Sequence, residues 1–326
     1  MLPLLEVKDL KTYFHTEYGV VRAVDGVSFV IEPSQTVGIV GESGCGKSVT
    51  SLAIMGLIPP PGRIVGGEIS YYQEGKGICL SKLDPKGKQM RSIRGNHIAM
   101  IFQEPMTSLN PVFTIGSQIM EPIVLHQHLS KKEARERAIQ MLDKVGIPQP
   151  EQRIDEYPHQ LSGGMRQRAM IAMALSCRAS LLIADEPTTA LDVTIQAQVL
   201  DLMIGLRNEF KTSIMMITHD LGLIAGMADE VVVMYLGKVV EQSKVRNVFH
   251  DPKHPYTQGL MDSVPSITSS KIKLNPIEGV VPDPLDAPLG CGFEPRCRKS
   301  MEVCETNVPS LKEVASNHWA ACWLYE

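Results

Sequence analysis

Residues 41–48 read Gly41-Glu42-Ser43-Gly44-Cys45-Gly46-Lys47-Ser48, the G-x-x-x-x-G-K-[ST] pattern of a phosphate-binding loop. The apolar residues 36–40 before it predict a buried strand, and residues 49–57 after it predict a helix. Glycines let backbone N–H groups point at phosphate oxygens, and the helix N-terminus adds partial positive charge. In this pattern Lys47 reaches the β- and γ-phosphates and Ser48 ligates Mg²⁺. A single match can also be a chance glycine-rich turn, so motifs further along the chain must decide.

The composition indicates a folded protein without a polynucleotide partner. The 326 residues allow one large domain or two smaller ones, and 44% apolar and 21% charged residues are ordinary for a soluble protein. The net charge of −4 gives no electrostatic reason to expect nucleic acid as a partner. No apolar run reaches about 18 residues, and residues 1–11 lack the pattern of a secretory signal. We therefore expect a cytoplasmic location.

Strand and helix patterns alternate along most of the chain. Strands are predicted at residues 4–10, 20–24, 27–31, 68–72, 98–102, 181–184 and 213–218, with a hairpin at 231–235 and 238–241. A Pro/Gly-rich turn is predicted at 59–67, and helices at 131–145 and 194–210. This alternation predicts an α/β fold with a parallel sheet. Prolines become frequent near residue 264, where we place a boundary between a main domain (1–263) and a small, irregular, Cys-rich C-terminal domain (264–326).

Two adjacent carboxylates end the apolar strand at residues 181–184. Asp185, at the carboxyl end of a buried strand, can hold Mg²⁺ opposite Ser48. Glu186 points to the other face of the strand end and is placed to polarise an attacking water. Pro187 turns the chain away and keeps both carboxylates at the edge of the sheet. The alternative is a strand that happens to stop at acidic surface residues.

A second helix start also carries glycines and a capping residue. Ser162, Gly163 and Gly164 introduce a helix predicted at about residues 165–176 and form a second anion-binding terminus. Taken alone, such residues are more often a helix cap than a ligand site. Two phosphate sites in one compact domain make sense if the second serves nucleotide held by a partner copy.

In order and spacing these motifs resemble those of an ABC-type ATPase. The matching segments, within roughly residues 4–260, are 41–48, Leu161–Met165, Leu181–Glu186, Thr189-Ala190-Leu191-Asp192 and Thr218-His219-Asp220, with Gln103 at the Q-loop position. The resemblance implies a P-loop NTPase nucleotide-binding domain with a RecA-like core, an antiparallel β arm and a helical subdomain at about 104–178. It also implies an ATP sandwich, in which each half contributes a phosphate loop and a signature motif.

The resemblance assigns a role to each matching residue. It implies that ATP is bound by Gly41, Ser43, Gly44, Cys45, Gly46, Lys47, Ser48, Val49 and Gln103. It implies that Ser48 and Gln103 ligate Mg²⁺ with support from Asp185, that Glu186 is the general base, and that His219 contacts the γ-phosphate. Ser162, Gly163 and Gly164 would close on the partner's nucleotide, with Asp192 at the dimer seam. Met165 stands where the family usually has Gln, which leaves Ser162 and the anion-binding amides in place.

Adenine stacking needs an aromatic residue upstream of the phosphate loop. Tyr13 and Phe14 are adjacent on a strand, so only one of them can face the base. Family spacing favours Phe14, Tyr13 stays open, and either ring can instead belong to the core.

Three further motifs resemble the oligopeptide/dipeptide importer subgroup, namely Glu104–Pro111, Tyr157–Gln160 and His254–Thr257. The resemblance implies a prokaryotic ATPase at the cytoplasmic face of the membrane. Its implied partners are two transmembrane permease subunits, a second, related ATPase subunit and, indirectly, an extracytoplasmic peptide-binding protein. Some relatives import nickel or glutathione-like compounds, which is the alternative substrate class. A soluble, non-transport ABC ATPase and a regulatory module built around the cysteine tail are the rival interpretations.

Four cysteines crowd the last part of the chain, at Cys291, Cys297, Cys304 and Cys322. In a reducing compartment four thiolates suit Zn²⁺ or an iron–sulfur cluster better than disulfides. Structural zinc usually uses close C-x₂₋₄-C pairs, so the wider spacing here favours a [4Fe–4S] cluster, with zinc and unliganded thiols as alternatives. The tail also resembles the cluster-bearing extension of some peptide-importer ATPases. Cys45, inside the phosphate loop, is either a tolerated small residue or a redox-active thiol.

Overall fold

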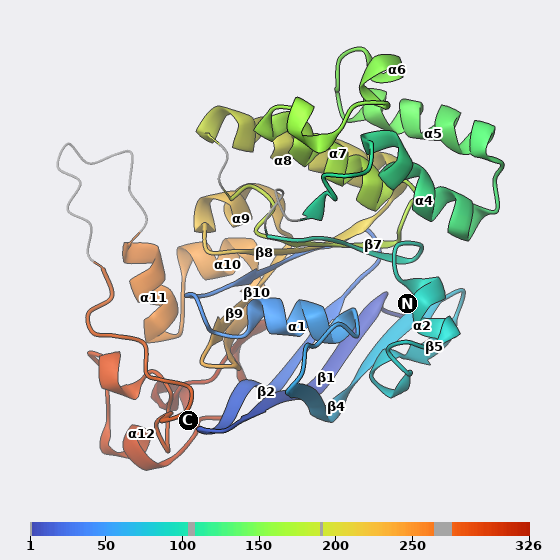
Figure 1. Cartoon of the computed structure of the whole chain (residues 1–326). Coiled ribbons are helices and arrows are strands. Elements are labelled where there is room, and N and C mark those ends of the chain that lie inside the picture. The colour runs from blue at the N-terminus through green and yellow to red at the C-terminus, as the bar shows by residue number, and fades with distance from the viewer. Residues whose placement is uncertain (1, 104–107, 190–191, 264–275) are drawn as a thin grey trace, which may run out of the picture. The chain divides into compact units, whose positions relative to one another are not determined.

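The computed structural model describes residues 2–103, 108–189, 192–263 and 276–326 (Figure 1). The internal contacts divide the chain into two compact units. Unit 1 comprises Met1–Ile31, Thr36–Lys82 and Ile217–Glu326, and unit 2 comprises Glu32–Gln35 and Leu83–Met216. Each unit therefore contains segments that are far apart in the sequence.

An antiparallel sheet forms the first layer of unit 1. Its strand order is β2 (Gly19–Ile31), β1 (Leu5–Thr16), β4 (Gly62–Gln73) and β5 (Lys76–Cys79). Apolar residues on one face, such as Leu5 and Ile69, are fully buried, which anchors the sheet to the core. The sheet agrees with the antiparallel arm that the sequence predicted.

Two sequence predictions in this sheet were wrong. The strands expected at 20–24 and 27–31 are one strand, because a bulge absorbs Gly26: Leu10 pairs with Val27 and Lys11 with Asp25. The turn expected at 59–67 is shorter, because β4 already begins at Gly62 and pairs with β1 over this segment. A glycine-rich composition suggested turns where the partner strand enforces extended backbone.

A second sheet carries the phosphate loop. Within unit 1 its order is β11 (Lys312–Ala315), β12 (His318–Ala320), β10 (Lys238–Lys244), β9 (Glu230–Tyr235) and β3 (Thr36–Val40). All five residues of β3 are buried, as the predicted apolar strand required, and β3 runs parallel to β9. The helices of this unit are α1 (Lys47–Ile54), α9 (Leu221–Met227), α10 (Val245–His250), α11 (Pro255–Asp262) and α12 (Glu302–Thr306).

The tail differs from the irregular, separate domain that the sequence predicted. Strands β11 and β12 form a hairpin, and β12 pairs with β10 in the register Glu241↔Ala320. The tail therefore continues a sheet of unit 1, which proline frequency alone could not reveal. The proposed boundary at residue 264 falls in 264–275, outside the described residues, and stays a prediction.

Unit 2 combines parallel strands with a group of helices. Strands β6 (Ile98–Ile101), β7 (Leu181–Asp185) and the start of β8 (Ser213–Thr218) are neighbours, and β6 runs parallel to β7. The helices are α2 (Lys88–Ile93), α4 (Ile115–Gln127), α5 (Lys131–Lys144), α6 (Pro150–Arg153), α7 (Gly163–Leu175) and α8 (Val193–Phe210). The predicted helices at 131–145 and 194–210 are confirmed. Helix α5 starts with a capping box between Ser130 and Glu133, a local signal that explains its sharp beginning.

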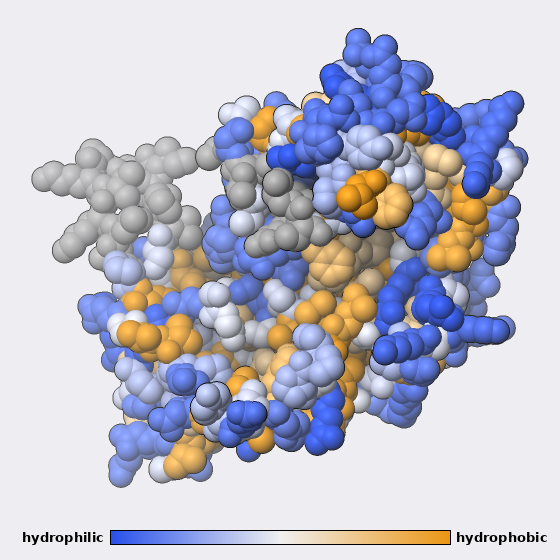
Figure 2. All heavy atoms as spheres, viewed as in Figure 1, coloured by the Kyte–Doolittle hydropathy of each residue, from blue (hydrophilic) through white to orange (hydrophobic). Residues whose placement is uncertain are grey.

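On the face shown in Figure 2, hydrophilic residues alternate with smaller groups of apolar ones. Among the helices that the structure describes, none has both the length and the apolar content needed to cross a lipid bilayer.

Candidate functional site

The phosphate loop joins β3 to α1 in unit 1, as predicted. Two of its glycines are required by close backbone approach. A Cβ on Gly41 would lie 2.2 Å from the Met234 carbonyl oxygen, and one on Gly46 would lie 2.2 Å from that of Ala23. Gly46 also has a φ of 98°, a left-handed conformation that glycine adopts without strain. The neighbouring strands therefore fix the curl of the loop.

The Lys47 ammonium lies inside this curl. Its Nζ donates to the carbonyl oxygens of Gly41, at 2.6 Å, and Glu42, at 2.9 Å, and the residue is only 6% exposed. Ser48 follows it in the first turn of α1, and an added Cβ on Gly44 would have open space around it. The loop thus presents a cation beside an accessible backbone segment, which suits an incoming phosphate.

Cys45 behaves as a packed thiol. It is buried, and this burial raises the pKa of the thiol above its usual value despite the nearby Lys47. A raised pKa lowers the thiolate population and hence the reactivity. These facts favour the interpretation of Cys45 as a tolerated small residue.

In unit 2 the structure brings Gln103 and Glu186 together. Gln103 Nε2 and Thr189 Oγ1 both donate to Glu186 Oε2, each at 3.0 Å. Glu186 has a φ of 46°, an uncommon conformation for a residue with a Cβ, directly after the buried Asp185 that ends β7. Two neutral donors therefore orient this carboxylate oxygen. Sequence reasoning missed Thr189 as one of those donors, although it lies in a quoted motif.

Ser162 caps α7, and its Oγ accepts a hydrogen bond from the Met165 N–H at 3.3 Å. Around Gly163 an added Cβ would meet no atom within 4 Å, whereas at Gly164 it would lie 3.1 Å from Ile195 of α8. Asp192 caps α8 in the same way, accepting from the Ile195 N–H at 3.0 Å. The capping interpretation is thus confirmed, and a role toward a partner's nucleotide stays a prediction. Ala190 and Leu191 of this motif, and residues 104–107 of the importer motif, lie outside the described residues.

His219 follows the buried strand β8 and is exposed. The next residue, Asp220, caps α9 by accepting from the Gly222 N–H at 2.7 Å and donates its own N–H to Thr218 Oγ1 at 3.0 Å. These bonds fix the backbone on both sides of His219. Unit 1 thus holds the phosphate loop and His219, and unit 2 holds Gln103, Asp185, Glu186 and the residues that begin α7 and α8.

The two candidate adenine-stacking residues have different surroundings. The Tyr13 hydroxyl donates to Asp25 Oδ1 at 2.7 Å, and burial together with this hydrogen bond raises the pKa of Tyr13 to about 12. Phe14 packs over Gly62, where an added Cβ would lie 2.5 Å from the ring. Both side chains thus have partners within the chain, and which of them stacks on adenine stays a prediction.

The four tail cysteines lie near one another. Burial is the main reason why the pKa of Cys291 is raised to about 11, and charges on Cys304, Cys322 and Cys297 add to the effect. All of them are free thiols. Among the described residues, however, no group of three or more His, Cys, Asp or Glu side chains is arranged to hold a metal ion. The donor chemistry fits a cluster or zinc, whereas the side-chain geometry does not form the predicted ligand set.

Comparison with known proteins agrees with this arrangement. The family model for ABC transporters matches residues 24–189, just over half of the chain, and the model for the oligopeptide/dipeptide transporter C-terminal region matches 240–304. The oligopeptide transport ATP-binding protein AppD of Bacillus subtilis is 55% identical and covers 100% of this chain and 98% of its own length. The dipeptide transport ATP-binding protein DppD of the same organism is 48% identical, covering 100% and 96%.

Among solved structures, a dimer of the ATP-binding cassette MJ0796 bound to ADP and Pi is similar, with a TM-score of 0.65 and 26% identity. The similarity covers 74% of this chain and 99% of that one. The chain therefore belongs to the ABC transporter family, as an ATPase of the oligopeptide/dipeptide transporter group.

Proposed function

We propose that this ATPase energises the import of di- and oligopeptides across the cytoplasmic membrane. The observation that carries the proposal is the full-length similarity, tail included, to ATP-binding proteins named for oligopeptide and dipeptide transport. The phosphate loop, with Lys47 held among its carbonyl oxygens, provides the matching chemistry.

ATP binds to the phosphate loop through the backbone N–H groups of its glycines and the residues beside them. The residues involved are Gly41, Ser43, Gly44, Cys45, Gly46, Lys47, Ser48 and Val49, with Phe14 stacking on adenine. On binding, the Lys47 ammonium exchanges neutral carbonyl oxygens for anionic phosphate oxygens. An ammonium is attracted more strongly by a full negative charge than by the dipole of a neutral carbonyl group, so this exchange favours the nucleotide.

Hydrolysis relies on a general base and on neutralisation of phosphate charge. Glu186 accepts a proton from the attacking water, and the two donors on its Oε2 keep the carboxylate oriented. His219 contacts the γ-phosphate. Ser48, Gln103 and Asp185 would hold Mg²⁺, which supplies positive charge beside the phosphates.

A second ATPase subunit completes the site. The α7 start at Ser162, Gly163 and Gly164 binds the γ-phosphate of nucleotide held by the partner, and Asp192 lies at the seam. The similar cassette MJ0796 is described as a dimer bound to ADP and Pi, which supports this reading. Formation and release of the pair then drive the two permease subunits through the helical subdomain, and a peptide-binding protein outside the membrane supplies the substrate.

Co-purification tests the assignment. The chain is extracted with mild detergent from cells that express it with a terminal affinity tag, and the attached proteins are identified by mass spectrometry. Two permease subunits and a second ATPase, with ATPase activity raised by peptide and peptide-binding protein, support the proposal. Stimulation by nickel or glutathione instead would favour the alternative substrate class, and recovery of only soluble proteins or RNA would contradict transport.

A second part of the proposal assigns a metal cluster to the four cysteines of the tail. We infer that Cys291, Cys297, Cys304 and Cys322 hold a [4Fe–4S] cluster, with zinc as the alternative. Their common placement supports this, and the ligand geometry would have to form when the metal binds. Iron, acid-labile sulfide and zinc are measured on protein purified without oxygen. About four iron atoms per chain are expected, and a metal-free tail would contradict the inference.

A further inference from the structure

We propose that the C-terminal tail positions the phosphate loop, with Arg296 and Tyr256 as the positioning residues that hold Glu42. This inference rests on the proposed role of residues 41–49 in ATP binding. It assigns the tail a function in the nucleotide site itself.

Arg296 lies between Cys291 and Cys297 and forms a two-pronged ion pair with the phosphate loop. Its Nη1 donates to Glu42 Oε2 at 2.6 Å and its Nη2 to Glu42 Oε1 at 3.1 Å. The Arg296 side chain is 3% exposed and that of Glu42 is 30% exposed. Because the guanidinium is planar and both prongs are used, this contact fixes direction as well as distance.

Arg296 makes further contacts with the tail and with β9. Its Nε donates to the Glu278 carbonyl oxygen at 3.1 Å, and Nη1 also lies 3.3 Å from the Tyr235 hydroxyl. The guanidinium stands 5.9 Å from the ring centroids of Tyr235 and Phe293. These contacts fix the orientation of the Arg296 side chain independently of Glu42, as a positioning residue requires.

Tyr256 holds the backbone of the same loop residue. The Glu42 N–H donates to the Tyr256 hydroxyl at 2.8 Å, and Tyr256 is fully buried. Its ring packs against Tyr235, at 4.6 Å between centroids, and against Phe293 of the tail, at 5.4 Å. Arg296 of the tail thus restrains the Glu42 side chain, and Tyr256 of α11, which packs against Phe293 of the tail, restrains the Glu42 N–H.

These restraints reach the cation of the site through one residue. The Glu42 carbonyl oxygen accepts from Lys47 Nζ at 2.9 Å and from the Cys45 N–H at 3.3 Å. A shift of Glu42 would therefore move an oxygen that positions the Lys47 ammonium and would alter the curl of the loop. The path from tail to cation is Arg296, Glu42 and Lys47.

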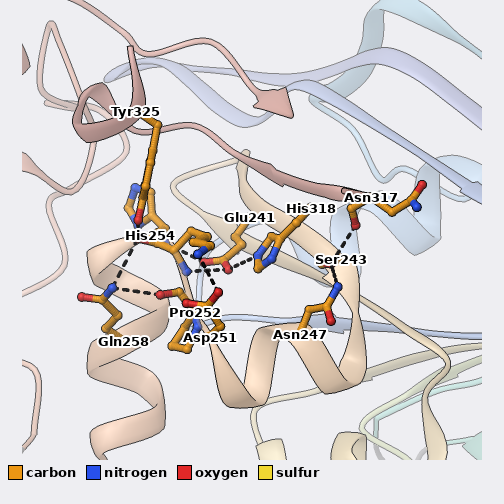
Figure 3. Close-up of polar contacts among 11 residues, drawn as sticks. Glu241, Ser243, Asn247, Asp251, Pro252, His254, Gln258, Asn317, His318 and Tyr325 are labelled. Carbon is orange, nitrogen blue, oxygen red and sulfur yellow. Dashed lines mark hydrogen bonds and ion pairs between the residues drawn. The ribbon is translucent and has the colours of Figure 1, made fainter. Parts of the chain in front are cut away.

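A buried carboxylate anchors the tail and the Tyr256 segment to one another (Figure 3). Glu241 of β10 is fully buried and contacts His318 of β12 through its Oε1, at 2.6 Å from Nε2. Its oxygens also accept from the N–H groups of Lys253 and His254, at 2.8 and 2.7 Å. The Tyr325 hydroxyl adds a bond to the Lys253 carbonyl oxygen at 3.1 Å. Glu241 thus connects the tail to the segment that carries Tyr256, at a place outside the phosphate loop.

Mg·ATP affinity of the full-length protein tests the proposal. Titration calorimetry at 20 °C compares the wild type with Arg296→Gln, Glu42→Gln and the double variant. Each single variant is expected to bind roughly tenfold more weakly, and the double variant no more weakly than the poorer single one, because the two residues act as a pair. In steady-state assays KM for ATP rises in proportion, while kcat at saturating ATP changes less than about threefold. Arg296→Lys, which keeps the charge without the fork, should lie in between.

Arg298→Gln is the matched control. Arg298 also adjoins Cys297, but its ion pair with Glu278 is 75% and 77% exposed, so its loss should leave ATP affinity unchanged. Wild-type affinity in both Arg296→Gln and Glu42→Gln would overturn the proposal, as would equal weakening by Arg298→Gln. If Arg296→Gln or Glu42→Gln lowers the melting temperature but leaves ATP affinity at 20 °C unchanged, the contact only stabilises the fold, and the positioning role is contradicted. Wild-type affinity in Lys47→Ala would instead contradict the ATP-binding role of the loop, and this inference with it.

Discussion

At the scale of single residues, the phosphate loop shows how a buried cation obtains hydrogen-bond acceptors from its own backbone. Lys47 is almost fully buried, and two carbonyl oxygens of its own loop accept its hydrogen bonds. A buried ammonium without partners would be costly, and these carbonyl oxygens stabilise its charge. Affinity for ATP should depend strongly on this one side chain.

Lys47→Ala is expected to weaken ATP binding roughly 10- to 100-fold, the range for losing hydrogen bonds to charged groups. Fluorescent nucleotide titration measures this affinity. Lys82→Ala is the control, because the Lys82 side chain is 70% exposed and pairs with Glu68 at the surface. Equal affinities in the wild type and Lys47→Ala would refute the assignment.

Glu186→Gln should retain ATP but lose hydrolysis by roughly 10² to 10⁴-fold, because an amide cannot accept the proton from water. The Gln side chain preserves an oxygen acceptor for Gln103 and Thr189, so the local geometry should survive. Phosphate release is measured under saturating ATP. Turnover near that of the wild type would remove Glu186 from the role of general base.

At the scale of elements, local signals predicted more than distant contacts did. The loop, β3 and the carboxylates after β7 were found because each depends on residues adjacent in sequence. The joined strand β2 and the early start of β4 were missed, because pairing with β1 overrides their glycine-rich composition. Arg296 was missed for a stronger reason, since 254 positions separate it from Glu42. No spacing rule connects residues so far apart.

Substitution of Ser162 at the start of α7 can distinguish a capping role from a ligand-binding role. Ser162→Ala should cost about 1 kcal/mol of stability through the lost cap, and it should also abolish ATP-driven pairing if Ser162 binds the partner's nucleotide. Ser130→Ala removes the comparable cap of α5 and serves as the control. Light scattering with Mg·ATP, in the Glu186→Gln background and with the co-purified second ATPase, measures pairing. If both variants pair normally, Ser162 is a cap alone.

His254 caps α11, because its Nδ1 accepts a hydrogen bond from the Tyr256 N–H at 3.0 Å. This cap predicts a pH dependence of stability. Burial lowers the pKa of His254 to about 4, against the opposing influence of Glu241, so His254 is neutral in the folded chain. The unfolded chain binds a proton near pH 6.5, and stability is therefore lost as pH falls from about 6.5 toward 4, by up to roughly 3 kcal/mol. Chemical unfolding at pH 7 and pH 5 measures the loss. His254→Asn, whose amide oxygen can accept the capping hydrogen bond in place of Nδ1, should flatten this dependence, and an unchanged pH slope would contradict it.

At the scale of the whole molecule, the residues proposed to act on ATP are divided between the two units. Unit 1 holds the phosphate loop and the tail that restrains Glu42, and unit 2 holds Glu186 and the α7 start. The proposed pairing with a second ATPase subunit would explain why one chain has two anion-binding helix starts. Sequence motifs predicted both helix starts, because each depends on residues that are adjacent in sequence.

Peptide uptake by a reconstituted transporter tests the central claim most directly. The co-purified permease and ATPase subunits are placed in lipid vesicles with the peptide-binding protein, and uptake of a radiolabelled dipeptide is followed with ATP on the side of the ATPase. Wild-type vesicles should accumulate the peptide, and vesicles with Lys47→Ala should accumulate it at least tenfold more slowly. Uptake that is independent of ATP, or that is unchanged by Lys47→Ala, would contradict the claim that this chain drives peptide import.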